Sequence, residues 1–483
     1  MVYDLYIYNT LTKQIEKFEP LTPSRVGFYS CGPTVYNFTH LGHLRTYILY
    51  DIIKRVLIFD GYKVKHVMNI TDVGHLLSDA DEGEDKIEKQ AIKEKKSAWD
   101  IAEFYTKDFL NNLKQTNIIL PDIIAPATKH IDEQIALIKK IEQAGFTYII
   151  SDGVYFDTSK LPDYGILNKQ NQTEKQATQR IEQSGEKKNI SDFALWKFSP
   201  KNQTRAMEWD SPWGVGFPGW HIECAAMSMK YLGDYFDIHA GGVDHIPVHH
   251  SNEIAEAEAV TGKHLAKYWI HGGFLNFSGE KMSKSKNNFI RLEDLQQYNI
   301  SPLAVRYSMY LGYYNKTLDF NLDSLYASST ALNNLIEFIK RVLKINQLYV
   351  AKKIKIQDNQ DSQDALDHYE EAFFRQVHNN FDMPSAIEIV WNLVKEYNKN
   401  PMNYNPQKVL DMLYKFDLIL GLKLSDITLD TIPQNIEKLA EERWLAKNNQ
   451  NWEEADRLRI HIQNEGYMID DFENFYLIKH IDK

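Results

Sequence analysis

Cysteine is scarce in this sequence: among its 483 residues only Cys31 and Cys224 carry a thiol, and they lie 193 positions apart. This scarcity excludes the dense disulfide framework of a small secreted domain. A single disulfide between the two is possible in principle. In a reducing compartment, however, such cysteines are more often free thiols or metal ligands.

Long apolar runs are also absent, and so is an excess of basic residues. No stretch approaches the roughly 20 apolar residues of a membrane helix. The first residues include an early acid, Asp4, and lack the cationic and apolar pattern of a secretory signal. We therefore expect a cytoplasmic protein that does not bind membranes. With 55 basic and 66 acidic residues the net charge is −11, which argues against non-specific nucleic-acid binding but permits a basic face on one domain.

A strand, a helix and a second strand are predicted near the start of this chain, which is too long for a single hydrophobic core. Residues 25–30 are typical of a short buried strand and 63–70 of a second strand. Residues 40–59 carry apolar side chains at helical spacing after the N-cap candidate Thr39. Such a unit is the right-handed crossover from which doubly wound, Rossmann-like parallel sheets are built. The sheet is expected to resume with strands at 235–242 and 268–273.

The rest of the chain differs in character from this sheet. Residues from about 97 to 199 contain a helical stretch at 128–143, two strands around Asp152-Gly153 and a polar run at 168–189, which indicates an inserted region. Beyond Leu292 the long amphipathic patterns predict an all-helical bundle. The C-terminal residues combine a helical pattern with a strand-like tail, so the predicted fold class is α/β, followed by a bundle and a small C-terminal domain.

The sequence HLGH contains His40, Gly42 and His43 at the start of the helix that follows the first strand. The N–H groups and dipole of a helix N-terminus favour anions, and two imidazoles add further donors for a nucleotide triphosphate. Gly42 would let a ring or phosphate approach the backbone. Taken alone, the motif is more often a pair of ordinary histidines.

The sequence GEKMSKSKNN, with Lys281 and Lys284, indicates a mobile loop. Two ammonium groups that close over a polyphosphate would stabilise charge on a pyrophosphate leaving group. A lysine-rich loop is usually only a solvated surface. Its combination with HLGH and with a parallel crossover unit favours the phosphate-binding interpretation.

Four side chains of the types that bind Zn²⁺ occur in distant parts of the sequence. Cys31 directly precedes the phosphate-binding turn, Cys224 lies in GWHIEC, and His249 and Glu253 are spaced i and i+4, on one face of a helix. His250, at i+3 from Glu253, is an alternative ligand. A structural zinc site, or two core cysteines without a metal, also remains open at this point.

These motifs together resemble those of a known family. HLGH and KMSKS are similar to the two signatures of class I aminoacyl-tRNA synthetases, with Leu41 in place of the usual isoleucine. Within that class, CGPTVY, GWHIEC and HHSNE resemble cysteinyl-tRNA synthetase. The resemblance runs essentially from Asp4 to the C-terminal tail and includes NITD at 69–72 and a helix of the WEEADRLR type.

The resemblance implies a function and a set of site residues. It implies ligation of L-cysteine to tRNA(Cys) with ATP and Mg²⁺, by a monomer in which Zn²⁺ takes the substrate thiolate as a further ligand. Without the resemblance, Trp220 could be a core aromatic and Gly242-Asp244 an ordinary turn. The implied roles are catalysis for His40, His43, Lys281 and Lys284; ATP binding for His40, Gly42, His43, Gly242, Asp244 and Lys284; cysteine binding for Gly32, Thr71 and Trp220; and zinc binding for Cys31, Cys224, His249 and Glu253.

The same resemblance divides the chain into parts. The helical bundle would bind tRNA and the last domain would recognise the anticodon, while the acidic segment 74–86 has no assigned role. The predicted parts are the two halves of the catalytic domain at 1–105 and 206–275, the connective insertion at 106–205, the KMSKS and stem-contact region at 276–325, the bundle at 326–430 and the anticodon domain at 431–483.

Three other functions compete with this interpretation. A cysteine ligase that acylates an amino sugar in thiol-cofactor synthesis would use the same site, but such relatives lack the final segment. A zinc-dependent hydrolase would account for the histidine and glutamate on one helix, but the HExxH motif with its general base is missing. A non-catalytic nucleotide- or tRNA-binding module would not need HLGH and KMSKS intact.

Overall fold

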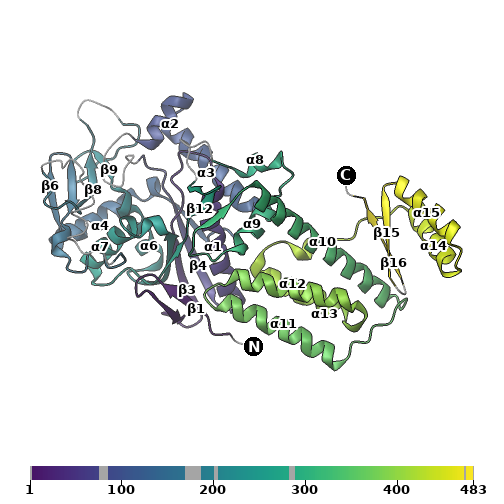
Figure 1. Cartoon of the computed structure of the whole chain (residues 1–483). Helices are drawn as coiled ribbons and strands as arrows, with labels where there is room; N and C mark the ends of the chain where they lie inside the picture. The colour runs from purple at the N-terminus through teal and green to yellow at the C-terminus, as the bar shows by residue number, and fades with distance from the viewer. Residues whose placement is uncertain are drawn as a thin grey trace. The chain divides into compact units, whose positions relative to one another are not determined.

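The computed structural model describes residues 3–74, 85–168, 186–200, 205–281, 289–472 and 475–481. These residues form two compact units (Figure 1). The first comprises Met1–Ser329 with Phe374–Ser385, and the second comprises Thr330–Phe373 with Ala386–Lys483. A search of the described helices finds none with the length and apolarity of a membrane span.

A five-stranded parallel sheet forms the centre of the first unit. All seven residues of its strand Phe236–Gly242 are buried, because helices cover both faces of a sheet of this kind. The parallel Rossmann-like sheet predicted from the strand, helix and strand at 25–70 is thereby confirmed. The strand order is β11 (Ala266–Gly272), β10 (Phe236–Gly242), β3 (Arg25–Ser30), β4 (Lys63–Ile70) and β5 (Ile123–Pro126).

Three helices position the functional residues around this sheet. Helix α1 (Leu41–Phe59) connects β3 to β4 and packs on β4, β10 and β11, whereas α6 (Trp220–Leu232) packs on β3 and β4. Helix α7 (His249–Thr261) follows β10 and packs on α6.

The N-cap of α1 is His40, so the prediction of Thr39 is wrong. The main-chain N–H of Thr39 instead donates to Asp108 Oδ2 at 3.0 Å. The helical bonds start one residue later, where the His40 carbonyl accepts from the N–H of Leu44 at 3.2 Å and His40 Nδ1 accepts from the N–H of His43 at 3.3 Å.

A buried histidine, His66 on β4, stacks on Phe28 of β3 with ring centroids 4.2 Å apart. Its Nε2 lies 2.8 Å from Ser30 Oγ, and only 2% of the residue is exposed. Burial, helped by the Lys54 ammonium, lowers the pKa of His66 well below its ordinary value. The folded protein therefore holds this imidazole neutral.

The neutral state of His66 makes folding stability depend on pH. Because the folded-state pKa lies below the unfolded value, only the unfolded chain gains this proton as the pH falls below about 6.5. We expect this group to remove up to about 1.4 kcal/mol of stability per pH unit on acidification. The urea-unfolding midpoint should therefore decrease between pH 7.5 and pH 5.5 in both proteins, but by less in His66→Gln than in wild type. Parallel losses in both proteins would contradict the assignment.

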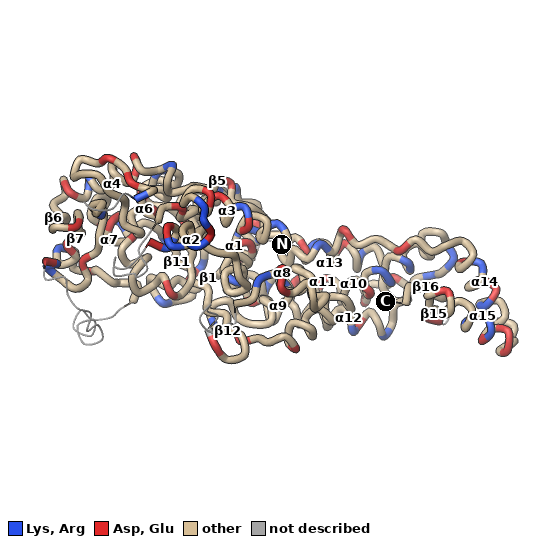
Figure 2. The backbone as a smooth tube through the Cα atoms, turned by 90° about the horizontal axis from the view of Figure 1, so that it is seen from above, with Lys and Arg blue, Asp and Glu red and all other residues tan. Residues whose placement is uncertain are grey.

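Two helices that sequence patterns did not predict lie between residues 86 and 115. They are α2 (Lys86–Glu94) and α3 (Ala98–Gln115), and Figure 2 shows charges of both signs on α2. Helix α3 begins with a capping box between Ser97 and Asp100. Its buried residues include Ile101, Tyr105, Phe109 and Leu113, a spacing of four that was present in the sequence.

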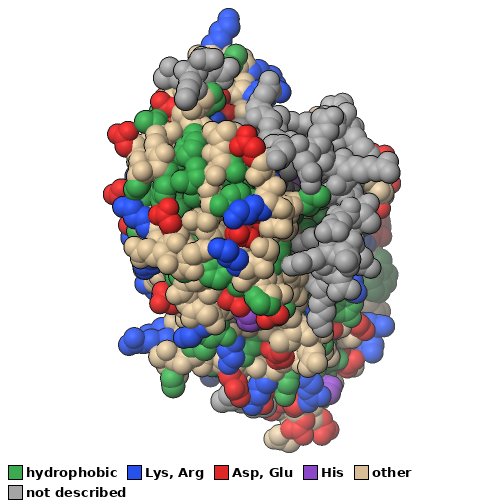
Figure 3. All heavy atoms as spheres, turned by 90° about the vertical axis from the view of Figure 1, so that its left-hand side faces the viewer, with side chains coloured by type: hydrophobic (Ala, Val, Ile, Leu, Met, Phe, Trp, Pro, Cys, Tyr) green, Lys and Arg blue, Asp and Glu red, His purple; other side chains and the backbone are tan. Residues whose placement is uncertain are grey.

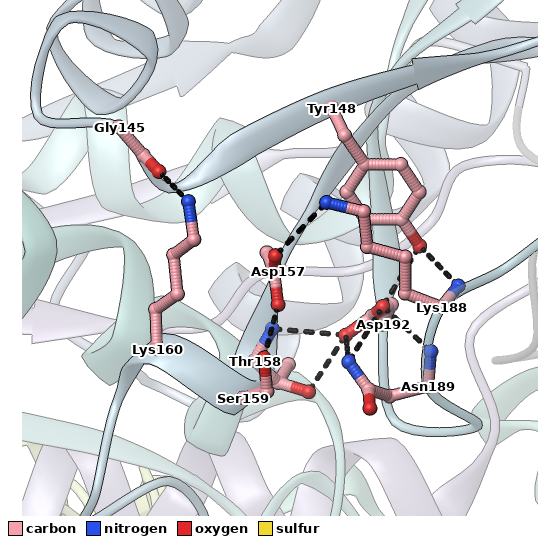
Figure 4. Close-up of polar contacts among 9 residues, drawn as sticks. All are labelled: Gly145, Tyr148, Asp157, Thr158, Ser159, Lys160, Lys188, Asn189 and Asp192. Atoms are coloured by element: carbon pink, nitrogen blue, oxygen red, sulfur yellow. Dashed lines mark hydrogen bonds and ion pairs between the residues drawn. The ribbon is translucent and has the colours of Figure 1, made fainter.

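The inserted region contains an antiparallel sheet. Near its edge, Asp192 accepts hydrogen bonds from the N–H of Thr158 at 2.9 Å and from the hydroxyl of Tyr148 at 2.7 Å (Figure 4). Figure 3 views this side of the molecule, where hydrophobic and charged side chains are mixed. Most of the polar run predicted to be a loop, at 169–185, lies outside the described residues. The strands are β6 (Thr147–Ile150), β7 (Gly153–Phe156), β8 (Phe193–Phe198) and β9 (Gly216–Pro218), preceded by α4 (Ile131–Gln143).

Smaller elements complete the first unit. A hairpin joins β1 (Tyr6–Asn9) to β2 (Gln14–Lys17). The others are β12 (Leu275–Phe277), β13 (Glu280–Lys281), α8 (Leu292–Gln296), α9 (Pro302–Ser308) and β14 (Leu318–Phe320).

The second unit is mainly helical, as predicted. The single helical pattern expected over 444–466 is the end of one helix and all of a second, because Gln450 has a positive φ of 57° and Asn451 caps the next helix. The helices that lie in it wholly or in part are α10 (Leu322–Val350), α11 (Gln360–His378), α12 (Met383–Lys399), α13 (Pro406–Leu420), α14 (Gln434–Asn448) and α15 (Trp452–Asn464), and its hairpin is β15 (Tyr467–Asp471) with β16 (Tyr476–His480). The six-part division of the chain stays a prediction.

Candidate active site and metal centre

A pocket of about 690 Å³ opens at the carboxyl ends of β3 and β10. These neighbouring strands lie where the order of the sheet reverses, since α1 leads from β3 to β4 on one side while β10 lies on the other. Ligands of open α/β sheets bind at such switch points. The pocket is therefore the default site for chemistry in the first unit.

The signature histidines line this pocket at the start of α1. The rings of His40 and His43 stack with centroids 3.6 Å apart, and Gly42 lies between them in sequence. The side chain of His43 is exposed to the pocket. Because protein surrounds the pocket, the imidazole is desolvated, and this desolvation lowers the pKa of His43 to about 4. His43 is therefore a neutral donor or acceptor at pH 7, rather than a cation.

The residues predicted after β10 lie in the same pocket. Gly242 ends the strand and Asp244 follows in a short 3-10 turn. A Cβ on Gly242 would lie 2.3 Å from Asp244 Oδ1, so the position accepts only glycine without a shift of that carboxylate. The lysine loop contributes less here: Lys281 is the last residue of β13, and Lys284 lies outside the described residues.

The four predicted metal ligands meet at the inner end of the pocket. Cys31 directly follows β3, Cys224 lies in the second turn of α6, and His249 and Glu253 face the same side of α7. One ligand atom from each lies within 4.8 Å of the others, and all four residues are buried. Segments more than 200 positions apart are thus brought to one point.

The surroundings of this group shift the pKa values of its members in opposite directions. The hydrogen bond to Cys31 and burial raise the pKa of Cys224, and burial raises that of Cys31. Burial opposes the charged form of Glu253, but the electrostatic attraction of His239, its hydrogen bond to Glu253 and the nearby His249 outweigh burial and lower the pKa of Glu253 to about 2.

A second possible group overlaps the first and bears on the choice of histidine. Cys31 and Glu253 also lie within 4.8 Å of ligand atoms of His239 and His250. The Nε2 of His250 is 3.1 Å from Cys31 Sγ, and its Nδ1 is 2.7 Å from Nε2 of His271. Only the group with His249 includes both cysteines, and the choice of His249 stays a prediction.

Sequence reasoning missed the histidines around these ligands. His221 Nδ1 lies 2.9 Å from His249 Nδ1, and His239 Nε2 lies 2.7 Å from Glu253 Oε2. The available signal was a histidine inside each of two mainly apolar strands, His239 in β10 and His271 in β11. Buried polar residues of this kind require partners and often mark a site.

The predicted substrate residues Gly32, Thr71 and Trp220 line the pocket beside the metal ligands. A Cβ on Gly32 would lie 1.7 Å from the carbonyl oxygen of Asn69, so no side chain fits there. The Thr71 hydroxyl donates to Glu223 Oε2 at 3.0 Å. The Trp220 ring centroid lies 5.1 Å from that of His249.

Comparison with known proteins agrees with this geometry. A family model, tRNA synthetases class I (C) catalytic domain, matches residues 17–330. Methionyl-tRNA synthetase of Mycobacterium tuberculosis, solved with methionyl-adenylate, aligns with a TM-score of 0.62 over 83% of this chain and 93% of its own, at 16% identity. The leucine enzyme of Agrobacterium radiobacter K84 aligns with a TM-score of 0.60 over 85% of each chain, at 11% identity, which concerns the fold alone. The first unit therefore contains the catalytic domain of a class I tRNA synthetase, with the fold of that class.

Curated relatives identify the family within that class. Cysteine-tRNA ligase 1 of Burkholderia lata is 44% identical over 97% of this chain and 95% of its own length. Cysteine-tRNA ligases of Zymomonas mobilis and Treponema denticola are both 41% identical, covering 95% and 97% of this chain and 94% and 98% of their own lengths. The chain belongs to the cysteine-tRNA ligase family.

Proposed function

We propose that this chain activates L-cysteine with ATP and transfers the cysteinyl group to tRNA(Cys). In the first step a carboxylate oxygen of cysteine bonds to the α-phosphorus, and the bond to pyrophosphate breaks. In the second step the terminal adenosine hydroxyl of the tRNA attacks the carbonyl carbon, and AMP leaves. The observation that carries the proposal is the meeting of Cys31, Cys224, His249 and Glu253 beside the signature histidines.

The ATP end of the site is assigned to residues at the start of α1 and after β10. The N–H groups at the start of α1 and the imidazoles of His40 and His43 would hold the phosphates, with Gly42 allowing close approach. Gly242 and Asp244 would bind the nucleoside, since a carboxylate after a strand end accepts ribose hydroxyls. Lys281 and Lys284 would stabilise the leaving pyrophosphate, together with Mg²⁺.

The buried quartet fits Zn²⁺ by its donor set. Two sulfurs, an imidazole nitrogen and a carboxylate oxygen are the usual zinc ligands. In addition, Glu253 Oε1 is buried without a satisfactory hydrogen bond among the described residues, although His249 Nε2 lies 3.2 Å away. Such an acceptor is available to a cation. Bound Zn²⁺ would favour a thiolate over a hydroxyl, which supplies selectivity for cysteine.

The chain's own residues would orient the amino acid beside that ion. Thr71 accepts from Asn69 Nδ2 at 3.1 Å and donates to Glu223, so its hydroxyl is held in a fixed direction. The bare backbone at Gly32 leaves room for the substrate, and Trp220 would pack against it. Because shape alone separates cysteine from serine by only about 1–3 kcal/mol, this packing could not supply the discrimination.

The second unit would bind the tRNA. We assign the helices α10 to α13 to the tRNA body and the last domain, 431–483, to the anticodon. The chain would act as a monomer. An amino-sugar ligase would use the same activation step without tRNA, so the second step separates these two functions.

Pyrophosphate exchange into ATP is the direct test of the activation step. We expect the purified zinc-loaded protein to exchange in the presence of L-cysteine, and L-serine to support less than about 0.5% of that rate, because a soft metal discriminates beyond a shape-based limit of roughly 10–200-fold. Transfer of radiolabelled cysteine to a tRNA(Cys) transcript should follow. Equal exchange with serine would remove the metal-based selectivity, and exchange without any transfer to tRNA would favour the amino-sugar ligase.

A further inference from the structure

One lysine, Lys86, lines the pocket near the predicted cysteine-binding residues. Its Nζ lies 4.9 Å from the ring centroid of Trp220 and 5.9 Å from that of Tyr36. Among the described residues that line the pocket, no other lysine or arginine occurs. Lys86 therefore brings positive charge to a pocket in which Asp244 carries the opposite sign and His43 is neutral at pH 7.

The start of α2 is anchored, and this fixes the position of Lys86. Asp85 caps the helix by accepting from the N–H of Ile87 at 2.8 Å and of Glu88 at 3.0 Å. It also forms a buried ion pair with Arg205. Ile87, the next residue, is fully buried. The backbone of Lys86 thus lies between two anchored neighbours.

Arg205 extends this anchor to the segment that leads to Trp220. Its Nη2 donates to the carbonyl of Gly74 at 2.8 Å, and its guanidinium lies 3.8 Å from the ring centroid of Phe217 in β9. Helix α6 begins with Trp220, three positions after Phe217. Arg205 therefore connects the segment that carries Lys86 with the segment that carries Trp220.

Resting on the proposed function, we propose that the Lys86 ammonium binds the carboxylate of the cysteine substrate. A cysteine whose sulfur lies at the metal quartet has its carboxylate carbon three bonds away, so a cation near the quartet can reach the carboxylate. The Trp220 ring neighbours both the predicted ligand His249 and Lys86. The carboxylate is thus placed against a cation while one of its oxygens attacks the α-phosphorus.

Two thiol ligands test this contact by a difference in binding. Cysteamine has the thiol and the ammonium group of cysteine but no carboxylate. Both would be titrated calorimetrically into the zinc-loaded full-length protein, as wild type, Lys86→Met and Lys86→Arg. A control, Lys93→Met, removes an exposed lysine from the same helix. The KM values for cysteine and ATP would be measured by pyrophosphate exchange.

We expect Lys86→Met to weaken L-cysteine binding and raise its KM by about tenfold, as loss of a hydrogen bond between charged groups predicts. Cysteamine binding should change less than about twofold, Lys86→Arg should recover most of the loss, and Lys93→Met should match wild type. Equal weakening of both ligands would show that Lys86 only supports Trp220 and would overturn the inference. A raised KM for ATP with unchanged cysteine binding would overturn it too, in favour of a phosphate contact.

The outcome for the wild-type protein separates this inference from the proposed function. Wild-type exchange together with unchanged binding in Lys86→Met would sink the inference alone. A wild-type protein that binds neither thiol ligand and shows no exchange would overturn the proposed function, and the inference with it.

Discussion

Replacing Cys224 by serine is expected to reduce bound zinc and cysteine-dependent exchange together, with a loss of about 100-fold or more in kcat/KM for cysteine. The basis is that even outer partners of metal ligands are worth about 10–100-fold. Cys224 is 1% exposed, and its sulfur is one of the four ligand atoms within 4.8 Å of each other. Zinc content by mass spectrometry and exchange kinetics measure the two effects.

A matched control comes from the same helix. Ala226→Ser places a hydroxyl two positions after Cys224, also at a buried position, but leaves all four ligands intact. We expect this variant to retain its zinc. If Cys224→Ser keeps full zinc content while Ala226→Ser behaves like wild type, Cys224 is not a ligand and the metal assignment fails.

Replacing Arg306 by methionine is expected to cause the largest loss of stability, about 3–5 kcal/mol, because the buried Asp51 loses one of its two arginine partners, with Arg55 remaining at 2.7 Å, and two main-chain carbonyls lose their donor. Arg306 on α9 is fully buried and forms an ion pair with Asp51 of α1. It also donates to the carbonyls of Thr116 and Asn117 at 3.0 and 3.2 Å. Hydrogen exchange of the α1 and α9 amides would report the loss, since it measures the opening of this region.

The control for Arg306 is an exposed ion pair on α3. Lys107 and Glu103 lie 2.6 Å apart with side chains 73% and 67% exposed. Lys107→Ala should change stability by less than about 1 kcal/mol, because solvent screens such pairs. Comparable exchange rates in Arg306→Met and Lys107→Ala would show that the buried pair contributes little to stability.

Sequence patterns predicted the sheet and the metal quartet for different reasons. The strands 25–30 and 63–70 are short and end in buried residues, and the helix between them keeps a helical period over nineteen residues, so local pattern was sufficient. The quartet was assembled from residue chemistry and from resemblance to a family. No periodicity could place Cys31 next to Cys224, because that contact depends on the order of strands in the sheet.

The features that sequence reasoning missed depend on long-range contacts. Lys86 follows Asp85, whose ion pair with Arg205 joins positions 120 residues apart, and no local pattern indicates that pair. The histidine cluster is formed by β10, β11, α6 and α7 together, so no single segment showed that its members meet. Helix α3 had a visible four-residue spacing, but charged residues between the apolar positions obscured it.

The position of β10 beside β3 has a consequence for how the protein is made. Cys31 leaves the ribosome more than two hundred residues before Glu253. At about 5–20 residues per second this interval is on the order of tens of seconds. During this interval the edge of β3 that pairs with β10 in the folded protein is unpaired, and Cys31 lacks the other three residues of the quartet. The candidate metal site and the closure of that edge can therefore form only late in synthesis, and until then the unpaired edge is exposed to pairing with other chains.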